Sequence, residues 1–321
     1  QYRFTARCLA SIASTPTTVR FEVIVVDDRS TDGTGDRLST IPGLRLERNT
    51  AGGGFVNACN RGIAAARGEL VLFLNNDTTV EPGWLEHLVG TFDRFPRAGV
   101  VGARLVFADG RLQEAGGIVW RDGSAWNYGR FQRPDDPRFA FARQVDYCSG
   151  ACLMVRRELL ETLGGFDPQF APGYYEDTDL AFSARAAGYE VWYQPRARIF
   201  HYEGASAGRS LAAGMKRFQT EHRDLLVRRW RAALEDHRPN GESPELEKER
   251  QVEKRLLVVE PRMIRPDRDA GSLRMLRWIE IFQELGYKVT FAPDNMLRVE
   301  PYVGDLQARG VEVLYLSLIH I

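Results

Sequence analysis

The sequence has little lysine and no excess of charge of either sign. Its 321 residues include 43 Lys or Arg and 43 Asp or Glu, and only four of the basic residues are Lys. A net charge of zero gives no global attraction to nucleic acid, so we expect no nucleic-acid partner. Any anionic ligand must instead be held by a local site.

Cysteines and long apolar runs are also scarce. The four cysteines form no C-x-x-C pair and have no histidine at zinc-finger spacing, which predicts buried thiols in a reducing cytoplasm. No apolar run approaches the roughly 18 residues of a membrane span, and no signal peptide is visible. The expected location is therefore the cytoplasm. Both ends of the chain, at Gln1 and at residues 316–321, are expected to be cut.

One segment, residues 209–231, is locally basic, with seven Arg or Lys residues against Glu221 and Asp224. Two interpretations stay open. The segment is either a solvated helix face, or a peripheral contact with diphosphates or with the anionic inner face of the membrane.

Strands and helices alternate over the first hundred residues. Residues 21–26 and 70–74 are continuous apolar runs typical of buried parallel strands, and residues 54–67 are predicted to form a helix that Gly68 ends. Another helix is predicted to begin near Pro82. Such alternation indicates an α/β fold whose ligands bind at the carboxyl ends of the strands.

Acidic and amide side chains follow both predicted strands. Asp27 and Asp28 follow the first, and Asn75, Asn76 and Asp77 follow the second. Carboxylates at the first position can accept hydrogen bonds from a nucleoside, and those at the second can bind Mg²⁺ or Mn²⁺. The alternative for each cluster is turn and capping chemistry.

A third acidic cluster lies in the first turn of a predicted helix. Glu176, Asp177 and Asp179 either interact favourably with the helix dipole or include a general base, because packing like charges together raises a pKa. Asp177 and Asp179 cannot face the same way on a helix, so one can serve chemistry while the other orients. His201 ends a predicted strand, and a lone histidine there is more often structural. His87, His222 and His237 are expected on helix surfaces.

The remaining chain divides into three parts. Residues 99–150 are irregular and include a loop with Trp126, Tyr128 and Phe131. Residues 238–253 carry Pro, Gly and alternating charge, which favours a linker. A new α/β pattern starts near residue 254. We therefore expect one domain at 1–237 and another unit at 254–321.

Taken in order, these motifs resemble those of family 2 glycosyltransferases, and their look is nearest to the rhamnosyltransferase-like branch. The resemblance covers about residues 2–210. The matching stretches are VIVVDDRSTDGT at 23–34, NACNRGIAAARG at 57–68, LNNDT at 74–78, DGRLQEAG at 109–116, GACLMVRR at 150–157, GGFD at 164–167, YEDTDL at 175–180 and FH at 200–201.

The resemblance implies a GT-A fold, in which a mixed, mostly parallel sheet is flanked by helices. It also implies inverting transfer of a sugar from a dTDP- or UDP-linked donor to a glycan or lipid-linked glycan, in bacterial cell-surface polysaccharide assembly. Asp177, with Glu176, would supply the catalytic base. Asp77 and His201 would bind Mg²⁺ or Mn²⁺. The residues implied to contact the nucleotide sugar are Asp27, Asp28, Asn60, Asn75, Asn76, Asp77 and Asp179.

Two departures from the family pattern affect the expected site. Asn75 stands where the family has the first Asp of its D-x-D motif, so one metal carboxylate is missing. The family's first strand, which would precede Tyr2 and help to bind the nucleotide, is expected to be absent.

The last part of the chain has a likeness of its own. LLVVE at 256–260, followed by RPDRDAGS at 265–272 and a helix, resembles the start of a family 4 glycosyltransferase of GT-B fold. A small accessory Rossmann-like unit is the alternative.

Two other functions compete with glycosyl transfer. A non-catalytic nucleotide-sugar or glycan-binding module on the same fold would bind without turnover and tolerate loss of Asp177. A nucleotidyltransferase would also use metal and carboxylates, but usually needs a Gly-rich phosphate loop after its first strand. Site residues rather than fold must decide between them.

Overall fold

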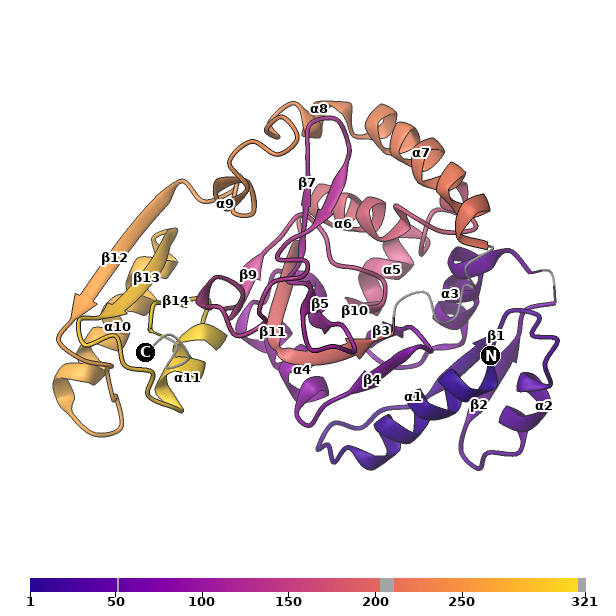
Figure 1. Ribbon diagram of the computed structural model, residues 1–321, viewed down its shortest axis with the longest axis horizontal. Helices are drawn as coiled ribbons and strands as arrows, with labels where there is room; N and C mark the ends of the chain where they lie inside the picture. Colours follow the sequence, from indigo (N-terminus) through magenta and orange to yellow (C-terminus); the bar gives the residue numbers. More distant parts are fainter. Residues whose placement is uncertain (51, 203–210, 317–321) are drawn as a thin grey trace.

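In the computed structural model, residues 1–50, 52–202 and 211–316 are described (Figure 1). The first segment forms a small parallel sheet of two strands, in which Val25 of β1 pairs with Leu46 of β2. The predicted strand at 21–26 begins only at Ile24, since Phe21 is half exposed. The elements of this segment are α1 (Tyr2–Ser14), β1 (Ile24–Asp27), α2 (Thr34–Ser39), β2 (Arg45–Arg48) and α3 (Gly54–Ala65).

A seven-stranded mixed sheet forms the centre of the molecule. Its main order is β3-β10-β5-β11-β4, with β6 added to β5 and β9 added to β11. Strands β3, β5 and β11 run parallel to one another, whereas β10 and β4 run antiparallel to their neighbours. Its strands are β3 (Leu70–Leu74), β4 (Thr78–Val80), β5 (Ala98–Val106), β6 (Leu112–Glu114), β9 (Arg143–Gln144), β10 (Cys152–Arg156) and β11 (Glu190–His201).

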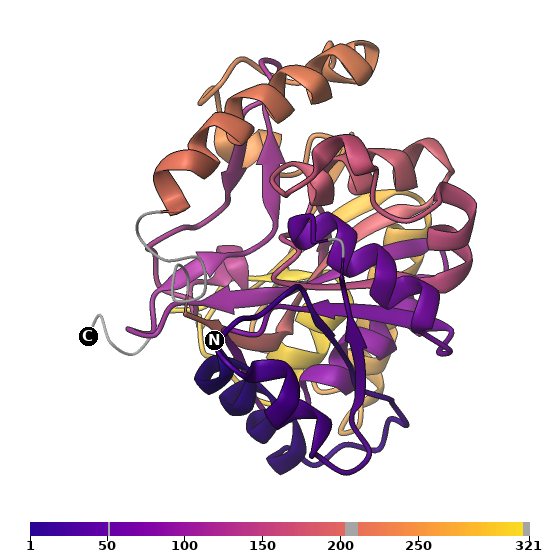
Figure 2. The same cartoon turned by 90° about the vertical axis from the view of Figure 1, so that its right-hand side faces the viewer.

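Helices cover both faces of this sheet. On one face, Trp84, Leu88 and Phe92 of α4 (Trp84–Arg94) pack with α1 against alternate residues of β5 and β10. On the other, α3, α5 (Arg157–Leu163) and α6 (Glu176–Ala186) pack against the opposite set, which includes Leu153 and Val155. Each of these fully buried side chains contributes about 1.5–3 kcal/mol. The resulting layers, seen edge-on in Figure 2, are those of the expected α/β class.

Parallel strands bring the candidate site residues to one edge of the sheet. The carboxyl ends of β3 and β11 lead to Asp77 and His201, respectively. Strand β10 runs the other way, and its first residue, Cys152, pairs with Leu74. The segment just before β10, including Gly150, therefore lies at the same edge.

The segment expected to be a linker is packed on the first domain. Arg250 forms a buried ion pair with Asp146 at 2.7 Å, and Glu247 pairs with Arg238 at 2.8 Å. The alternating charges of 238–253 thus serve buried pairs rather than solvation. The elements around it are the hairpin β7 (Gly117–Val119) and β8 (Ala125–Asn127), the 3₁₀ turns Pro137–Phe139 and Pro168–Phe170, and helices α7 (Leu211–Arg229), α8 (Arg231–Leu234) and α9 (Pro244–Glu247).

From residue 217 onward, most basic side chains of α7 are matched by acidic ones. Arg217 pairs with Glu221, Arg223 with Asp224, and Arg229 with Asp167. Arg209 lies outside the described residues. Among the residues described here, no helix combines the length and apolar character needed to span a bilayer. Peripheral membrane contact stays a prediction.

The last part of the chain is a three-stranded parallel sheet of order β12-β13-β14. It contacts the first domain, for example where the Ala142 N–H donates to the Gln307 carbonyl at 2.9 Å. In Figure 1 it lies at the opposite end of the molecule from β1 and β2. Its elements are β12 (Lys254–Glu260), α10 (Ala270–Glu284), β13 (Tyr287–Pro293), α11 (Tyr302–Ala308) and β14 (Glu312–Val313).

Candidate active site

The two predicted metal ligands lie together at the sheet edge. Asp77 Oδ1 is 3.3 Å from His201 Nε2, and both side chains are buried. Their spacing is set by the sheet: His201 pairs with Thr78 in the β4–β11 ladder, and the Tyr202 N–H donates to the Asp77 carbonyl at 2.8 Å. Residues far apart in sequence are thus brought into one pair by backbone pairing.

Gln113 contacts the other nitrogen of the His201 ring, with its Oε1 3.1 Å from Nδ1. When Nδ1–H donates to this oxygen, Nε2 of the neutral ring presents a lone pair toward the Asp77 carboxylate. Two facing acceptors at 3.3 Å repel unless a proton or a metal cation lies between them. The donor set therefore fits a divalent cation held by Asp77 and His201.

No group of three or more His, Cys, Asp or Glu side chains suited to a metal occurs in residues 1–50, 52–202 and 211–316. Two protein ligands are nevertheless enough for a Mg²⁺-type ion that shares a substrate diphosphate, because such ions keep waters and phosphate oxygens in their shell.

Asp177 is held by backbone donors, one of which lies in the turn that precedes β10. Its Oδ2 accepts from the Gly150 N–H at 3.0 Å, and its Oδ1 accepts from the Thr178 N–H at 2.7 Å. Burial raises the pKa of Asp177 above its ordinary value, and these hydrogen bonds oppose the rise. A half-buried carboxylate with a raised pKa is a better proton acceptor than a solvated one.

Glu114 is a buried carboxyl group next to Asp177. Its Oε1 accepts from the Ser149 N–H at 2.9 Å, so neighbouring amides of one turn serve Glu114 and Asp177. Burial, with a smaller effect from the Asp177 charge, raises the pKa of Glu114 to about 8. A continuous chain of contacts thus runs from Asp77 through His201 and β6 to Asp177.

Glu176 precedes Asp177 and is more deeply buried. Burial and then the Asp177 charge raise the pKa of Glu176 well above its ordinary value. Its Oε2 is buried and has no hydrogen-bond partner among the described residues. The preceding Tyr174 and Tyr175 both have positive φ, 74° and 66°, an unfavourable backbone for non-glycine residues that is often found at functional sites.

Asp27 is the last residue of β1, and Asp28 begins the loop that follows. Asp27 Oδ1 accepts from the Ser30 N–H at 3.0 Å, as capping chemistry predicts. Asp28 Oδ1 accepts from Asn49 at 2.7 Å and Oδ2 from the Gly54 N–H at 3.0 Å. Gly54 has φ of +78°, and a Cβ there would lie 2.5 Å from Pro172. Asp28 therefore ties β1 to the start of α3, next to the loop that leads to Asp177.

Other predicted nucleotide-sugar residues are engaged elsewhere. The Asn60 amide exchanges two 2.8 Å hydrogen bonds with the Phe166 backbone. Asp179 faces α7, where it accepts from Trp230 at 2.7 Å and from Arg229 at 3.2 Å. Asn76 donates to Thr5 at 3.0 Å, and the Asn75 N–H donates to the Ala151 carbonyl. The structure pairs Asp77 with His201, and these two connect to Asp177 only through Gln113 and Glu114 of β6 and the turn at 149–150. Asn60 and Asp179 make their contacts elsewhere.

Sequence reasoning gave no role to Gln113 or Glu114. The feature of the sequence that could have indicated a role for them is that they are the two polar residues in the otherwise apolar stretch at 112–120. The expectation that His222 and His237 lie on helix surfaces is wrong, because both are buried. His222 Nδ1 lies 3.0 Å from the carbonyl oxygens of Gly173 and Tyr174, and so holds the loop before Glu176.

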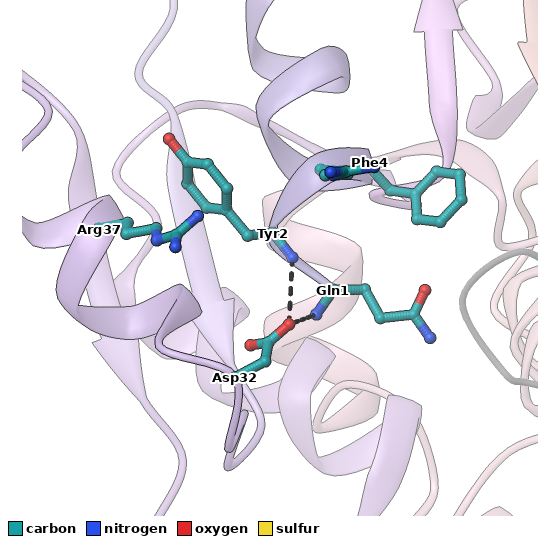
Figure 3. Close-up of a pocket in the computed structure, with 6 residues that line it drawn as sticks. Gln1, Tyr2, Phe4, Asp32 and Arg37 are labelled. Carbon is teal, nitrogen blue, oxygen red and sulfur yellow. Dashed lines mark hydrogen bonds and ion pairs between the residues drawn. The ribbon is translucent and has the colours of Figure 1, made fainter.

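A separate pocket lies between α1 and α2 and contains none of the predicted site residues (Figure 3). There the Asp32 carboxylate accepts from the Tyr2 N–H at 3.3 Å and pairs with the amino group of Gln1 at 2.6 Å. We assign no role to it. The lining residues are Gln1, Tyr2, Arg3, Phe4, Asp32 and Arg37.

Known proteins support a family assignment. The family described as glycosyl transferase family 2 matches residues 2–164. The N-acetylglucosaminyl-diphospho-decaprenol L-rhamnosyltransferase of Mycobacterium tuberculosis is 30% identical over 260 residues, covering 71% of this chain and 82% of the relative. The O-antigen biosynthesis protein RfbC of Myxococcus xanthus is 37% identical over 148 residues, 44% of this chain. The chain spans only 24% and 11% of the length of two of the curated relatives it matches.

A solved structure supports the fold. The crystal structure of GalNAc-T7 with UDP, GalNAc and Mn²⁺ superposes with a TM-score of 0.58 at 16% identity, covering 74% of this chain and 48% of that one. The expected GT-A-type fold is thereby confirmed. Taken with the match over residues 2–164, these likenesses establish that the chain belongs to glycosyl transferase family 2.

Proposed function

We propose that this chain transfers a sugar from a nucleoside diphosphate sugar to a hydroxyl group of a glycan or lipid-linked glycan, with inversion. The observation that carries the proposal is the 3.3 Å approach of Asp77 to His201, joined through Gln113 and Glu114 to the turn that holds Asp177. Such a reaction needs two ligands for a cation and a general base, and these would lie at the edge of the sheet formed by the carboxyl ends of its parallel strands.

In the proposed reaction, Asp177 accepts the proton of the acceptor hydroxyl. The freed oxygen attacks the anomeric carbon of the donor, a new C–O bond forms, and the bond to the diphosphate breaks on the opposite face. Asp77 and His201 would hold Mg²⁺ or Mn²⁺, which when bound neutralises charge on the departing diphosphate. GalNAc-T7, which shares the fold, was solved with UDP and Mn²⁺.

The protonation of Glu176 and Glu114 determines how much negative charge surrounds the proposed base, Asp177. Both have raised pKa values because they are buried, so both favour the protonated form. Neutral neighbours leave Asp177 as the member that carries the negative charge. Asp27 and Asp28, at the end of β1, are proposed to contact the nucleoside, with Asn75 and Asn76 near the diphosphate.

The donor class and the pathway are proposed by analogy with relatives whose names state them. Relatives named for L-rhamnosyl transfer to N-acetylglucosaminyl-diphospho-decaprenol and for O-antigen biosynthesis support bacterial cell-surface polysaccharide assembly. A dTDP-linked or UDP-linked donor is the first to test.

The unit at 254–316 is proposed to be the start of a family 4 glycosyltransferase of GT-B type. Support comes from its sequence likeness and from its β-α-β-α-β order in a parallel sheet. Under this proposal the gene encodes two transferases in series.

The test is a panel of dTDP-, UDP- and GDP-sugars with Mn²⁺ and an N-acetylglucosaminyl-diphospho lipid. Wild type should form a glycoside of inverted configuration. Asp177→Asn should lower the rate roughly 10²–10⁴-fold while donor binding persists. Asp36→Asn, an exposed aspartate of α2, is the matched control and should transfer normally.

The competing functions predict other outcomes in the same assay. Donor binding without transfer, unchanged by Asp177→Asn, would identify a non-catalytic binding module. Release of inorganic pyrophosphate from a nucleoside triphosphate and a sugar phosphate would identify a nucleotidyltransferase.

A further inference from the structure

Two phenylalanine rings stack on the surface where β5 ends. Phe107 directly follows β5, and Phe131 lies in the loop after β8. Their centroids are 5.2 Å apart with 10° between the ring planes. Phe131 is 52% exposed, so this stack does not serve to fill the core. Small-molecule sites are lined mainly by apolar and aromatic side chains, with a few polar groups that fix orientation.

Two arginines extend the stack. The Arg130 guanidinium carbon is 4.9 Å from each ring centroid, and that of Arg111 is 5.0 Å from the Phe131 centroid. Arg111 is itself oriented by Asp109 at 2.7 Å. We call Phe107, Arg111, Arg130 and Phe131 the aromatic platform.

The backbone fixes the platform to β6. The Phe131 N–H donates to the Leu112 carbonyl at 2.7 Å, and the Leu112 N–H donates to the Gln132 carbonyl at 2.8 Å. Phe131 has a φ of +67°, a conformation disfavoured for an aromatic residue, and it keeps the ring exposed. The next two residues of β6, Gln113 and Glu114, contact His201 and the Asp177 turn.

The platform is also electrostatically connected to the base. The charge of Arg130 acts on the Glu114 carboxyl group and lowers its pKa, opposing the effect of burial. Arg130 therefore contacts the exposed rings and is close enough to the buried Glu114 for its charge to act there. The predicted nucleoside residues Asp27 and Asp28, by contrast, follow β1, which belongs to a different sheet.

We propose that the aromatic platform is the acceptor subsite, and that it binds a pyranose ring of the acceptor glycan. This inference rests on the proposed function and adds the place and chemistry of the second substrate. The exposed part of the Phe131 ring suits the C–H face of a pyranose, and the N–H groups of the neighbouring guanidinium groups that do not face Asp109 suit its hydroxyl groups. A ring bound there lies next to the strand that borders Asp177.

The proposal is tested by glycan binding, which requires no turnover. Methyl glycosides of N-acetylglucosamine, galactose and rhamnose are titrated against the whole chain with UDP and Mn²⁺ present, using saturation-transfer NMR. At least one glycoside should bind wild type. Phe131→Ala should weaken it roughly five- to tenfold, and Phe131→Trp should retain it.

Phe21→Ala is the matched control. Phe21 is also about half exposed, at 50%, but it lies before the first residue of β1, in another sheet from the platform. It should leave glycan binding unchanged, and UDP binding should be unchanged in every variant. The proposal is overturned if no glycoside binds wild type, if Phe131→Ala binds as wild type does, or if it loses UDP equally.

Transfer assays separate this inference from the proposed function. If Phe131 is needed for glycan binding but no transfer occurs, the platform stands and the transferase assignment fails. If transfer occurs and Phe131→Ala leaves the acceptor KM unchanged, the transferase assignment stands and the platform fails.

Discussion

At the scale of residues, the Asp77–His201 pair makes the sharpest prediction. Asp77→Asn removes the charge that offsets a cation, so Mn²⁺ should bind roughly 10- to 100-fold more weakly. Isothermal titration with Mn²⁺ in the absence of donor measures this directly. His87→Ala, a half-buried histidine of α4, should change nothing. Equal affinity in Asp77→Asn would contradict the cation assignment.

Glu114 gives a pH-dependent prediction. Its folded-state pKa of about 8 lies above the ordinary 4.5, so the folded state holds this proton more tightly than the unfolded state does. Its contribution to stability is therefore complete below pH 4.5 and is lost as pH rises toward 8, by a few kcal/mol in order of magnitude. Glu114→Gln, which mimics the protonated form, should lose less stability over this range.

Thermal melts of wild type and Glu114→Gln from pH 5 to pH 9 check this prediction. The difference in Tm between them should move in favour of the variant as pH rises. Parallel profiles would show that Glu114 titrates in the folded chain as it does in solvent.

At the scale of elements, α7 holds the loop that precedes the base. His222→Ala removes the hydrogen bonds to the carbonyl groups of Gly173 and Tyr174, and the Gly173 carbonyl loses this partner in a buried position. We expect a loss of about 1–3 kcal/mol in the free energy of unfolding and a lower kcat. Chemical denaturation and donor kinetics measure the two effects.

The neighbouring Glu221→Ala is the control for His222→Ala. Glu221 is exposed and pairs with Arg217 on the same helix, so its loss should cost less than about 1 kcal/mol. Similar losses in both variants would mean that α7, rather than the His222 contact, sets the effect.

Local patterns predicted most elements but not all their bounds. Apolar runs and Gly stops located β3 and α3, and the acidic clusters fell at strand ends as expected. Residues 190–201 form one long strand, β11, whose register with β5 shifts between Gln194 and Arg198, the stretch that contains Pro195. The contact between Gln113 and His201 spans 88 positions and could not be read from local patterns.

At the scale of the whole molecule, residues 238–253 act as a structural strap for the first domain. A chain that ends at residue 253 keeps this strap, so we expect its first domain to melt at the same temperature as it does in the full chain. A chain ending at 237 should be destabilised by roughly 3–5 kcal/mol or more, because it strips Arg250 from the buried Asp146.

Circular dichroism melts of the two truncated chains test this. Arg250→Ala in the longer chain removes the same ion pair by a single substitution and should lower its Tm as well. Equal Tm values for the two lengths would show that the strap is dispensable. Its sequence suggested a solvated linker, because composition alone cannot reveal which charges find buried partners.

The position of His201 on a ladder rung of the central sheet has a consequence for inactivation. Because His201 pairs with Thr78 in the β4–β11 ladder, the backbone spacing between His201 and Asp77 is held as long as that ladder is intact. β11 lies between β5 and β4, and amide hydrogens of such interior strands exchange mainly through global opening. Activity in rising denaturant should therefore be lost together with the sheet, at one midpoint, rather than fading beforehand.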